Sequence, residues 1–145
     1  MSLEVNKIRS PKAFKSAFAI REQAFVVEQG VPPEAEYDQY EESSTHFLAT
    51  SDGDPVGTAR WRFTSEGIKL ERFAVKKDYR GQGVGTALVK AVLEDLESNE
   101  EAKDKMRYLN AQLKAVPLYL HFGFQQVGEM FEECNILHYR MELKP

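Results

Sequence analysis

Three glycines placed two residues apart, Gly81, Gly83 and Gly85, constrain this chain more than any other feature. They follow a strand-like segment, Lys69–Val75, and directly precede a segment whose apolar residues recur at helical spacing. Glycine loses more backbone freedom on folding than any other residue, so this density weakens a regular element. A helix N-terminus carries unpaired N–H groups that favour an anion, and side chains would hold a diphosphate away from them. The segment therefore predicts a phosphate-binding strand–loop–helix, to which Arg80 adds a charge-assisted contact.

Two common phosphate-binding motifs do not fit this loop. The P-loop pattern G-x-x-x-x-G-K-[ST] is absent from the chain. The dinucleotide fingerprint G-x-G-x-x-G fails as well, because Thr86 stands where its third glycine belongs. A nucleotide-binding regulator is therefore a weaker reading of the loop than a protein that binds another diphosphate.

Periodicity and turn residues predict a mixed α/β chain. Residues 3–9 alternate as a strand, and Ser10 with Pro11 is typical of a helix start. Apolar residues at three- and four-residue steps extend that helix to about Glu28, and Arg21 within its apolar stripe is expected to pair with a carboxylate or carbonyl. A loop is predicted at 30–45, strands at 46–63 (about an Asp52–Gly53 turn), 67–75 and 106–113, helices from about Gly83 to Leu96 and from Pro117 to Gly123, and a closing hairpin at 123–131 and 135–143.

Composition limits the class of protein and its partners. The length of 145 residues and the apolar content of 42% predict one globular domain spanning residues 1–145. The chain lacks both a signal segment and an apolar run of the roughly 20 residues that span a membrane, so we expect no membrane partner. The single cysteine, Cys134, can form no internal disulfide, which indicates a reducing cytoplasm. The three histidines lack metal-ligand spacing, and the net charge of −4 argues against a nucleic-acid partner.

The charges are unevenly distributed along the chain. From Glu22 to Ala59 there are nine Asp or Glu residues and no Lys or Arg. Basic residues gather instead near the glycine loop. This pattern predicts that the acidic stretch, including Glu34, Glu36 and Asp38, attracts a cationic ligand, while the basic region attracts an anionic one. A solvated acidic loop without a ligand is the alternative.

The glycine loop and its surroundings resemble a known superfamily. Arg80-Gly81-Gln82-Gly83-Val84-Gly85 is similar to the [Q/R]-x-x-G-x-[G/A] acetyl-coenzyme A loop of the GNAT N-acetyltransferases. The wider segment "ERFAVKKDYRGQGVGTALV" resembles the strand–loop–helix of that superfamily, and "AVPLYLHFGF" resembles its A-x-x-x-Y-x-x-x-GF ending. "IREQAFVVEQGVPPEAEYD", His46 and "GEMFEECNILHYRMEL" look like the small bacterial branch called ElaA-like or YjcF-like.

The resemblance implies a fold and an activity. The fold is the GNAT acyl-CoA N-acyltransferase fold, a mostly antiparallel α/β sheet with a splayed parallel strand pair and flanking helices. The activity is transfer of the acetyl group of acetyl-CoA to a primary amine, on a small molecule or a peptide, by direct attack in a ternary complex. A non-catalytic acyl-CoA sensor or scaffold is the alternative, and a homodimer formed through an edge strand remains open.

The resemblance also assigns residues to the cofactor. Gln112 takes a position at which many relatives have Asn. Tyr119 corresponds to the tyrosine that faces the departing sulfur, and its phenol is protonated at neutral pH. The full set implied to bind acetyl-CoA is Phe73, Ala74, Val75, Arg80, Gly81, Gln82, Gly83, Val84, Gly85, Thr86, Gln112 and Tyr119.

The acceptor side is less strongly specified by the sequence. Glu71 is predicted as the general base, because it lies two residues before Phe73 and, by strand alternation, on the same face. Residues predicted to border the acceptor pocket are Glu28, Gln29 and His46. Each of three predicted roles has a structural alternative. Tyr119 could be a packing residue, Glu28 a solvated residue at a helix end, and His46 a hydrogen-bonded residue at a sheet edge. His138 is expected to be structural, and Cys134 has no required role.

Overall fold

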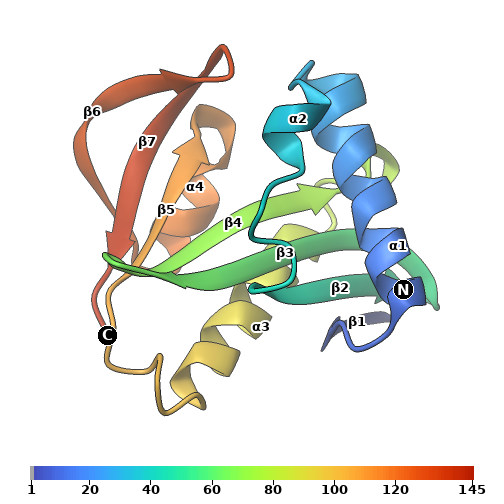
Figure 1. Cartoon of the computed structure of the whole chain (residues 1–145), viewed down its shortest axis with the longest axis horizontal. Helices are drawn as coiled ribbons and strands as arrows, with labels where there is room; N and C mark the ends of the chain where they lie inside the picture. The colour runs from blue at the N-terminus through green and yellow to red at the C-terminus, as the bar shows by residue number, and fades with distance from the viewer. Residues whose placement is uncertain (1) are drawn as a thin grey trace.

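A computed structural model describes residues 2–145, so Met1 of the predicted domain 1–145 lies outside the described residues. In residues 2–145, seven strands form one sheet in the order β1-β2-β3-β4-β5-β7-β6 (Figure 1). Neighbouring strands are antiparallel except β4 and β5, which are parallel. The strands are β1 (Leu3–Lys7), β2 (Thr45–Ser51), β3 (Asp54–Thr64), β4 (Gly67–Val75), β5 (Arg107–Gln112), β6 (Gln125–Glu133) and β7 (Ile136–Leu143).

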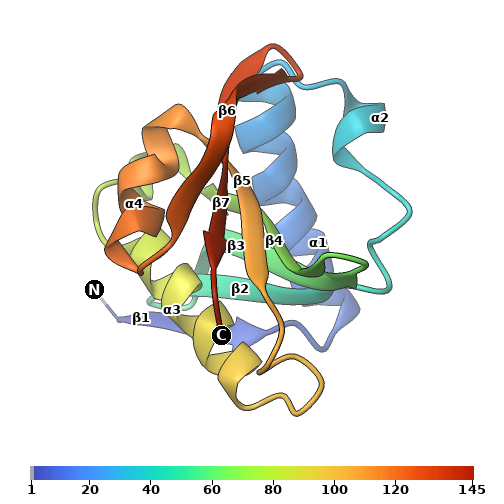
Figure 2. The same ribbon diagram turned by 90° about the vertical axis from the view of Figure 1, so that its left-hand side faces the viewer.

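Helices cover both faces of this sheet. α1 and α2 lie on one side, and α3 and α4 lie on the other (Figure 2). The helical segments are α1 (Pro11–Arg21), the π-helix η1 (Glu22–Glu28), α2 (Pro33–Glu36), the 3₁₀ turn η2 (Lys77–Tyr79), α3 (Val84–Glu97), the 3₁₀ turn η3 (Leu113–Ala115) and α4 (Val116–His121).

The local signals in the sequence account for most element boundaries. The Ser10 hydroxyl accepts a hydrogen bond from the Ala13 amide at 3.2 Å, which confirms the predicted start of α1. The helix predicted to continue to Glu28 does so, but it widens into the π-helix η1 after Arg21. The predicted loop at 30–45 contains one element that the sequence analysis missed, the short helix α2, which Pro33 begins.

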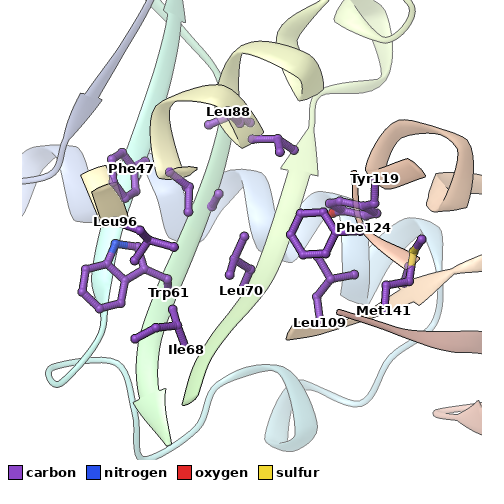
Figure 3. Close-up of a cluster of buried hydrophobic side chains, with 14 of the residues drawn as sticks. Phe47, Trp61, Ile68, Leu70, Leu88, Leu96, Leu109, Tyr119, Phe124 and Met141 are labelled. Carbon is purple, nitrogen blue, oxygen red and sulfur yellow. The ribbon is translucent and has the colours of Figure 1, made fainter. Parts of the chain in front are cut away.

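The core lies between the sheet and α3. Val84, Leu88, Val92 and Leu96 recur along one side of the helix, and each is at most 1% exposed. They pack against sheet residues that include Phe47, Trp61, Ile68 and Leu70 (Figure 3). A Cβ atom at Gly57 would lie 2.8 Å from the Val84 side chain, so a residue without a side chain is what lets α3 begin against β3.

The parallel pair β4–β5 is held by very few rungs. Ile68 pairs with Arg107 and Lys69 with Tyr108, and beyond these two positions the strands diverge toward their carboxyl ends (Figure 1). β4 remains paired to β3 on its outer side, and β5 remains paired to β7. The inner edges of Leu70–Val75 and Leu109–Gln112 therefore face each other with backbone groups that do not form a ladder between β4 and β5.

A β-bulge in β4 changes which way its side chains point. Glu71 pairs with Arg60 and Ala74 with Thr58, so Arg72 and Phe73 together oppose a single residue of β3. Arg72 adopts φ +59°, in the left-handed region that residues with a Cβ rarely occupy. The extra residue shifts the alternation by one, so Phe73 points to the opposite face from Glu71. The predicted common face for these two residues is therefore wrong.

Candidate active site

The divergence of β4 and β5 opens into a cleft of about 380 Å³. On the α3 side its walls include Phe73, Gly85, Leu88, Leu118 and Tyr119. On the α1 side they include Gln29, Glu36, Asn110, Gln112 and His138. The cleft thus reaches both faces of the sheet through the gap in its hydrogen bonding. A ligand entering from one face can meet a second ligand entering from the other.

The glycine loop lies at the N-terminus of α3. Gly81 and Gly83 have φ +77° and +88°, and a Cβ atom on either would meet no protein atom within 4 Å. Gly83 caps the 14-residue helix without any side-chain hydrogen bond, and no acidic residue occupies the first turn. The loop therefore presents open space next to helix N–H groups that no side chain caps.

Arg80 is held at the edge of the cleft. Its Nε donates a hydrogen bond to the Val75 carbonyl at 3.0 Å, and its Nη1 lies 2.8 Å from a Glu28 carboxylate oxygen. Glu28, predicted at the acceptor pocket, is thus a counter-ion of the residue predicted to contact phosphate. The described residues that line the cleft include Arg80 but not Glu28.

Tyr119 lines the cleft from α4. Its ring makes edge contacts with Phe73 and Phe124, at centroid distances of 5.9 and 5.8 Å. Figure 3 shows Tyr119 beside Phe124. Every side-chain nitrogen or oxygen shielded from solvent in residues 2–145 has a hydrogen-bond partner. The structure pairs the Tyr119 hydroxyl with no described group, so this hydroxyl is not fully shielded. Tyr119 is one of the residues that line the cleft. Burial of the ring raises the pKa of Tyr119, which therefore keeps its proton across the neutral range.

Three carboxylates of the acidic stretch, those of Glu36, Asp38 and Glu41, are ion-paired within the fold. Glu36 is 3% exposed and accepts a hydrogen bond from Arg21 Nε at 2.5 Å, while Arg72 approaches its other oxygen at 3.1 Å. Asp38 contacts Arg60 and Arg72, and Glu41 contacts Arg21 and Arg60. The pairing predicted for Arg21 is confirmed. The expected cation-attracting surface at Glu36 and Asp38 is not, because basic residues from elsewhere in the chain occupy both carboxylates.

Glu71 belongs to the same ion-pair network. It accepts hydrogen bonds from Arg60 and Arg62 and lies 3.4 Å from the Lys69 ammonium. Burial acts to raise its pKa, but the charge of Arg60 and the hydrogen bond from Arg62 outweigh burial and hold the pKa below its usual value. A carboxylate in this state is a weak proton acceptor. This geometry disfavours Glu71 as the general base.

His46 lies away from the described cleft wall. It is 3% exposed, packs edge-on against Phe14 at 4.8 Å, and its Nε2 donates to the Glu41 carbonyl at 2.7 Å. Burial lowers the pKa of His46, which keeps the ring neutral. These contacts match the alternative reading of His46 as a hydrogen-bonded sheet residue, and they do not bring it to the acceptor side.

Gln29 and Gln112, from η1's end and from β5, meet inside the cleft. Their side-chain amides exchange two hydrogen bonds, at 3.2 and 2.9 Å. Two further cleft residues, Asn110 and His138, were missed as site residues by the sequence analysis. The signal for His138 was its place in an alternating strand: it is the cross-strand partner of Gln112 and so shares its face.

Two negative findings apply to residues 2–145. No helix in this range is both long and apolar enough to cross a bilayer. Within the same range no three His, Cys, Asp or Glu side chains are grouped so that they could hold a metal ion.

Comparison with known proteins identifies relatives along nearly the whole chain. Residues 10–145 match the profile described as "Acetyltransferase (GNAT) domain". The Bacillus subtilis protein YjcF, described as an uncharacterized N-acetyltransferase, is 39% identical over 134 residues, covering 92% of this chain and 94% of that protein.

Two solved structures are similar over 97% of this chain and 99% of their own, each at 27% identity. They are Escherichia coli ElaA, with a TM-score of 0.86, and an acyl-CoA N-acyltransferase from Pseudomonas aeruginosa, with a TM-score of 0.84. The predicted fold, with its splayed parallel pair, is thereby confirmed.

Proposed function

The chain belongs to the GNAT family of acetyltransferases, and from this premise we propose that it transfers the acetyl group of acetyl-CoA to a primary amine. The observation that carries the proposal is the cleft through the β4–β5 gap. It extends from Arg80 and Gly85, at the two ends of the glycine loop, to a polar pocket on the other face of the sheet. A direct reaction between two bound substrates needs this arrangement, because both must reach one point.

The α3 side fits acetyl-CoA. The Gly81–Gly85 loop and the first N–H groups of α3 would hold the diphosphate, with Arg80 as the nearest cation. The free inner edge of Phe73–Val75 would bond the amide groups of the pantetheine arm and place the thioester in the gap. Gln112, bonded to Gln29, would border the thioester from the β5 side.

Tyr119 is the residue we assign to the leaving group. The amine nitrogen forms the new C–N bond, and the C–S bond breaks with its electron pair on sulfur. The Tyr119 hydroxyl then donates its proton to the thiolate and regains one from the acceptor nitrogen, through water. Burial raises the pKa of the tyrosine, so the proton that it donates is present at neutral pH.

The acceptor binds on the α1 side. Its walls combine apolar residues of η1 and of the loop after it with the amides of Gln29, Asn110 and Gln112. Because Glu36 is already paired with Arg21 and Arg72, it offers little net charge to an acceptor. We therefore propose recognition by shape and hydrogen bonds, on a small molecule or on a peptide amine.

Release of free thiol from acetyl-CoA, measured against a panel of amino sugars, polyamines, amino acids and peptides, tests the proposed function. Turnover that depends on the amine supports acetyl transfer. Tight acetyl-CoA binding with no turnover across the panel favours the sensor or scaffold instead.

Gly83→Val is expected to weaken acetyl-CoA binding by roughly tenfold or more, or about 1.4 kcal/mol. The branched side chain would enter the open space above the α3 N-terminus, where the diphosphate is proposed to lie. Isothermal titration calorimetry measures the affinity directly.

Gly53→Val is the matched control for Gly83→Val. Gly53 has the same φ of +88° and the same absence of protein atoms within 4 Å, but it lies in the β2–β3 turn. Both variants carry the backbone strain of a β-branched residue at positive φ, and only Gly83→Val should lose affinity. Equal affinities in the two folded variants contradict the placement of the diphosphate.

A further inference from the structure

The imidazole of His138 is the one buried basic group of the described cleft wall that has no charged partner. Lys114, which also lines the cleft without a charged partner, is exposed to solvent. The carboxylates of Glu36 and Glu71 are ion-paired there, as are Lys69, Arg72 and Arg80. His138 is 7% exposed, and its ring stacks on Phe131 at a centroid distance of 5.6 Å and an interplanar angle of 19°. The ring is therefore fixed in position without being engaged by another charge.

The hydrogen bond at Nδ1 decides the tautomer of His138. Nδ1 lies 2.7 Å from the Ile136 carbonyl oxygen, which can only accept, so Nδ1 carries the proton of the neutral ring. Nε2 then holds a free lone pair. Shielded side-chain nitrogens in residues 2–145 all have partners, and Nε2 has none among the described groups, so Nε2 is accessible. His138 itself lines the cleft.

We propose that His138 is the general base of the reaction, removing a proton from the acceptor ammonium at Nε2. This inference rests on the proposed function, because it needs an amine in the α1 side of the cleft. The ammonium gives one proton to Nε2, which passes it to solvent, and the neutral amine then attacks the thioester. Ammonium and acetyl-CoA thus yield amide, free thiol and one released proton. Gln112, directly across the β5–β7 pair, and Gln29 would orient the amine beside the imidazole.

Charged groups near His138 come from its own strand and from the walls of the cleft. Arg140 lies two residues along β7, with its own carboxylate partners Glu66 and Glu142. The remaining charged groups come from the hairpin end, from η3 and from across the cleft. Those that line the cleft are Glu133, Lys114, Lys69 with Glu71, Arg72 with Glu36, and Arg80, which is paired with Glu28.

His138→Asn tests the inference. Asparagine can keep the donor to the Ile136 carbonyl, because its Nδ2 takes the place of Nδ1, but it has no basic nitrogen. With the best acceptor of the panel, kcat/KM at neutral pH should fall by about 10²-fold, within the range of a positioned base. Acetyl-CoA affinity should stay unchanged. The acid limb of the parent's pH profile, where the base of the reaction is protonated, should disappear in the variant.

A second variant and an NMR measurement on the parent test the role of His138 without relying on His138→Asn alone. His138→Ala should recover activity when imidazole is added, since the free base can enter the vacated space. Nitrogen NMR of the ¹⁵N-labelled parent should show Nδ1 protonated and Nε2 unprotonated at neutral pH. An Nε2–H tautomer, or a pH profile that His138→Asn leaves unchanged, overturns the inference. A parent that acetylates no amine in the panel refutes the proposed function instead, and the tautomer measurement is unaffected by that failure.

Discussion

Arg60→Met is expected to lower the free energy of unfolding by about 3–5 kcal/mol, because it leaves buried carboxylates without their counter-ion. The Arg60 side chain is 0% exposed and lies within 2.8 Å of Asp38, Glu41 and Glu71. Burial acts to lower the pKa of Arg60, but the hydrogen bonds and charges of Asp38 and Glu71 outweigh burial and raise it. The carboxylates therefore stabilise the charged guanidinium. Urea unfolding followed by circular dichroism measures the change.

Arg62→Met is the control for this prediction. Arg62 is the neighbour of Arg60 on the same face, shares Glu71, and stacks on Tyr40 at 3.8 Å, but its side chain is 15% exposed. We expect a loss of about 1 kcal/mol, as for a partly exposed ion pair. Equal losses in the two variants would contradict a special role for the Arg60 cluster.

The same cluster predicts how stability depends on pH. The pKa values of Asp38, Glu41 and Glu71 are each held below their usual range, since hydrogen bonds and charges from Arg21, Arg60 and Arg62 outweigh burial. Their stabilisation is present above an unfolded pKa of about 4 and is lost as pH falls through the folded values. Burial raises the pKa of Glu36, which acts in the opposite sense. The free energy of unfolding should therefore fall below about pH 4, and less steeply in Arg60→Met.

Tyr119→Phe is expected to lower kcat by about 10²–10⁴-fold with the best acceptor, the range of a positioned acid. The substitution keeps the ring that packs on Phe73 and Phe124, so folding and acetyl-CoA affinity should change little. If water reaches the sulfur and supplies the proton instead, the decrease in kcat should lie near the lower end of this range. Steady-state thiol release and calorimetric titration separate the two quantities.

Tyr108→Phe removes a hydroxyl outside the cleft and serves as the control. The Tyr108 hydroxyl lies 2.6 Å from that of Thr64, where β4 and β5 are still paired. Its removal should leave kcat within about twofold of the parent. A Tyr119→Phe variant that behaves like Tyr108→Phe, at unchanged affinity, returns Tyr119 to a packing role.

Local sequence signals were sufficient for most element boundaries and for the position of the glycine loop before α3. The sheet with its splayed parallel pair was expected from the family resemblance. Ser10 and Pro11 fix the start of α1, and the glycines at positive φ lead into α3 as their spacing predicts. These features depend on residues that are adjacent in the chain, so a few consecutive residues of the sequence are enough to predict them.

The acceptor side depended on contacts that no short window contains. Glu36 meets Arg72 across 36 residues, and Gln29 meets Gln112 across 83. The β-bulge between Glu71 and Phe73 could not be predicted from a glycine in the sequence, because Arg72 adopts the positive φ. Strand alternation therefore misplaced Glu71, and the role of the carboxylates changed once their distant partners were known.

The two-rung junction between β4 and β5 has a mechanical consequence. It divides the sheet into two parts, β1–β4 and β5-β7-β6, whose backbone ladders are joined by the pairs at Ile68 and Lys69. Side-chain contacts such as Thr64–Tyr108 and Glu66–Arg140 also connect the two parts. A molecule hydrogen-bonded to both inner edges would connect the two parts of the sheet and would raise the free energy of unfolding. A cosubstrate bound in this way would also stabilise the fold, and the melting temperature of the protein would increase with the cosubstrate concentration.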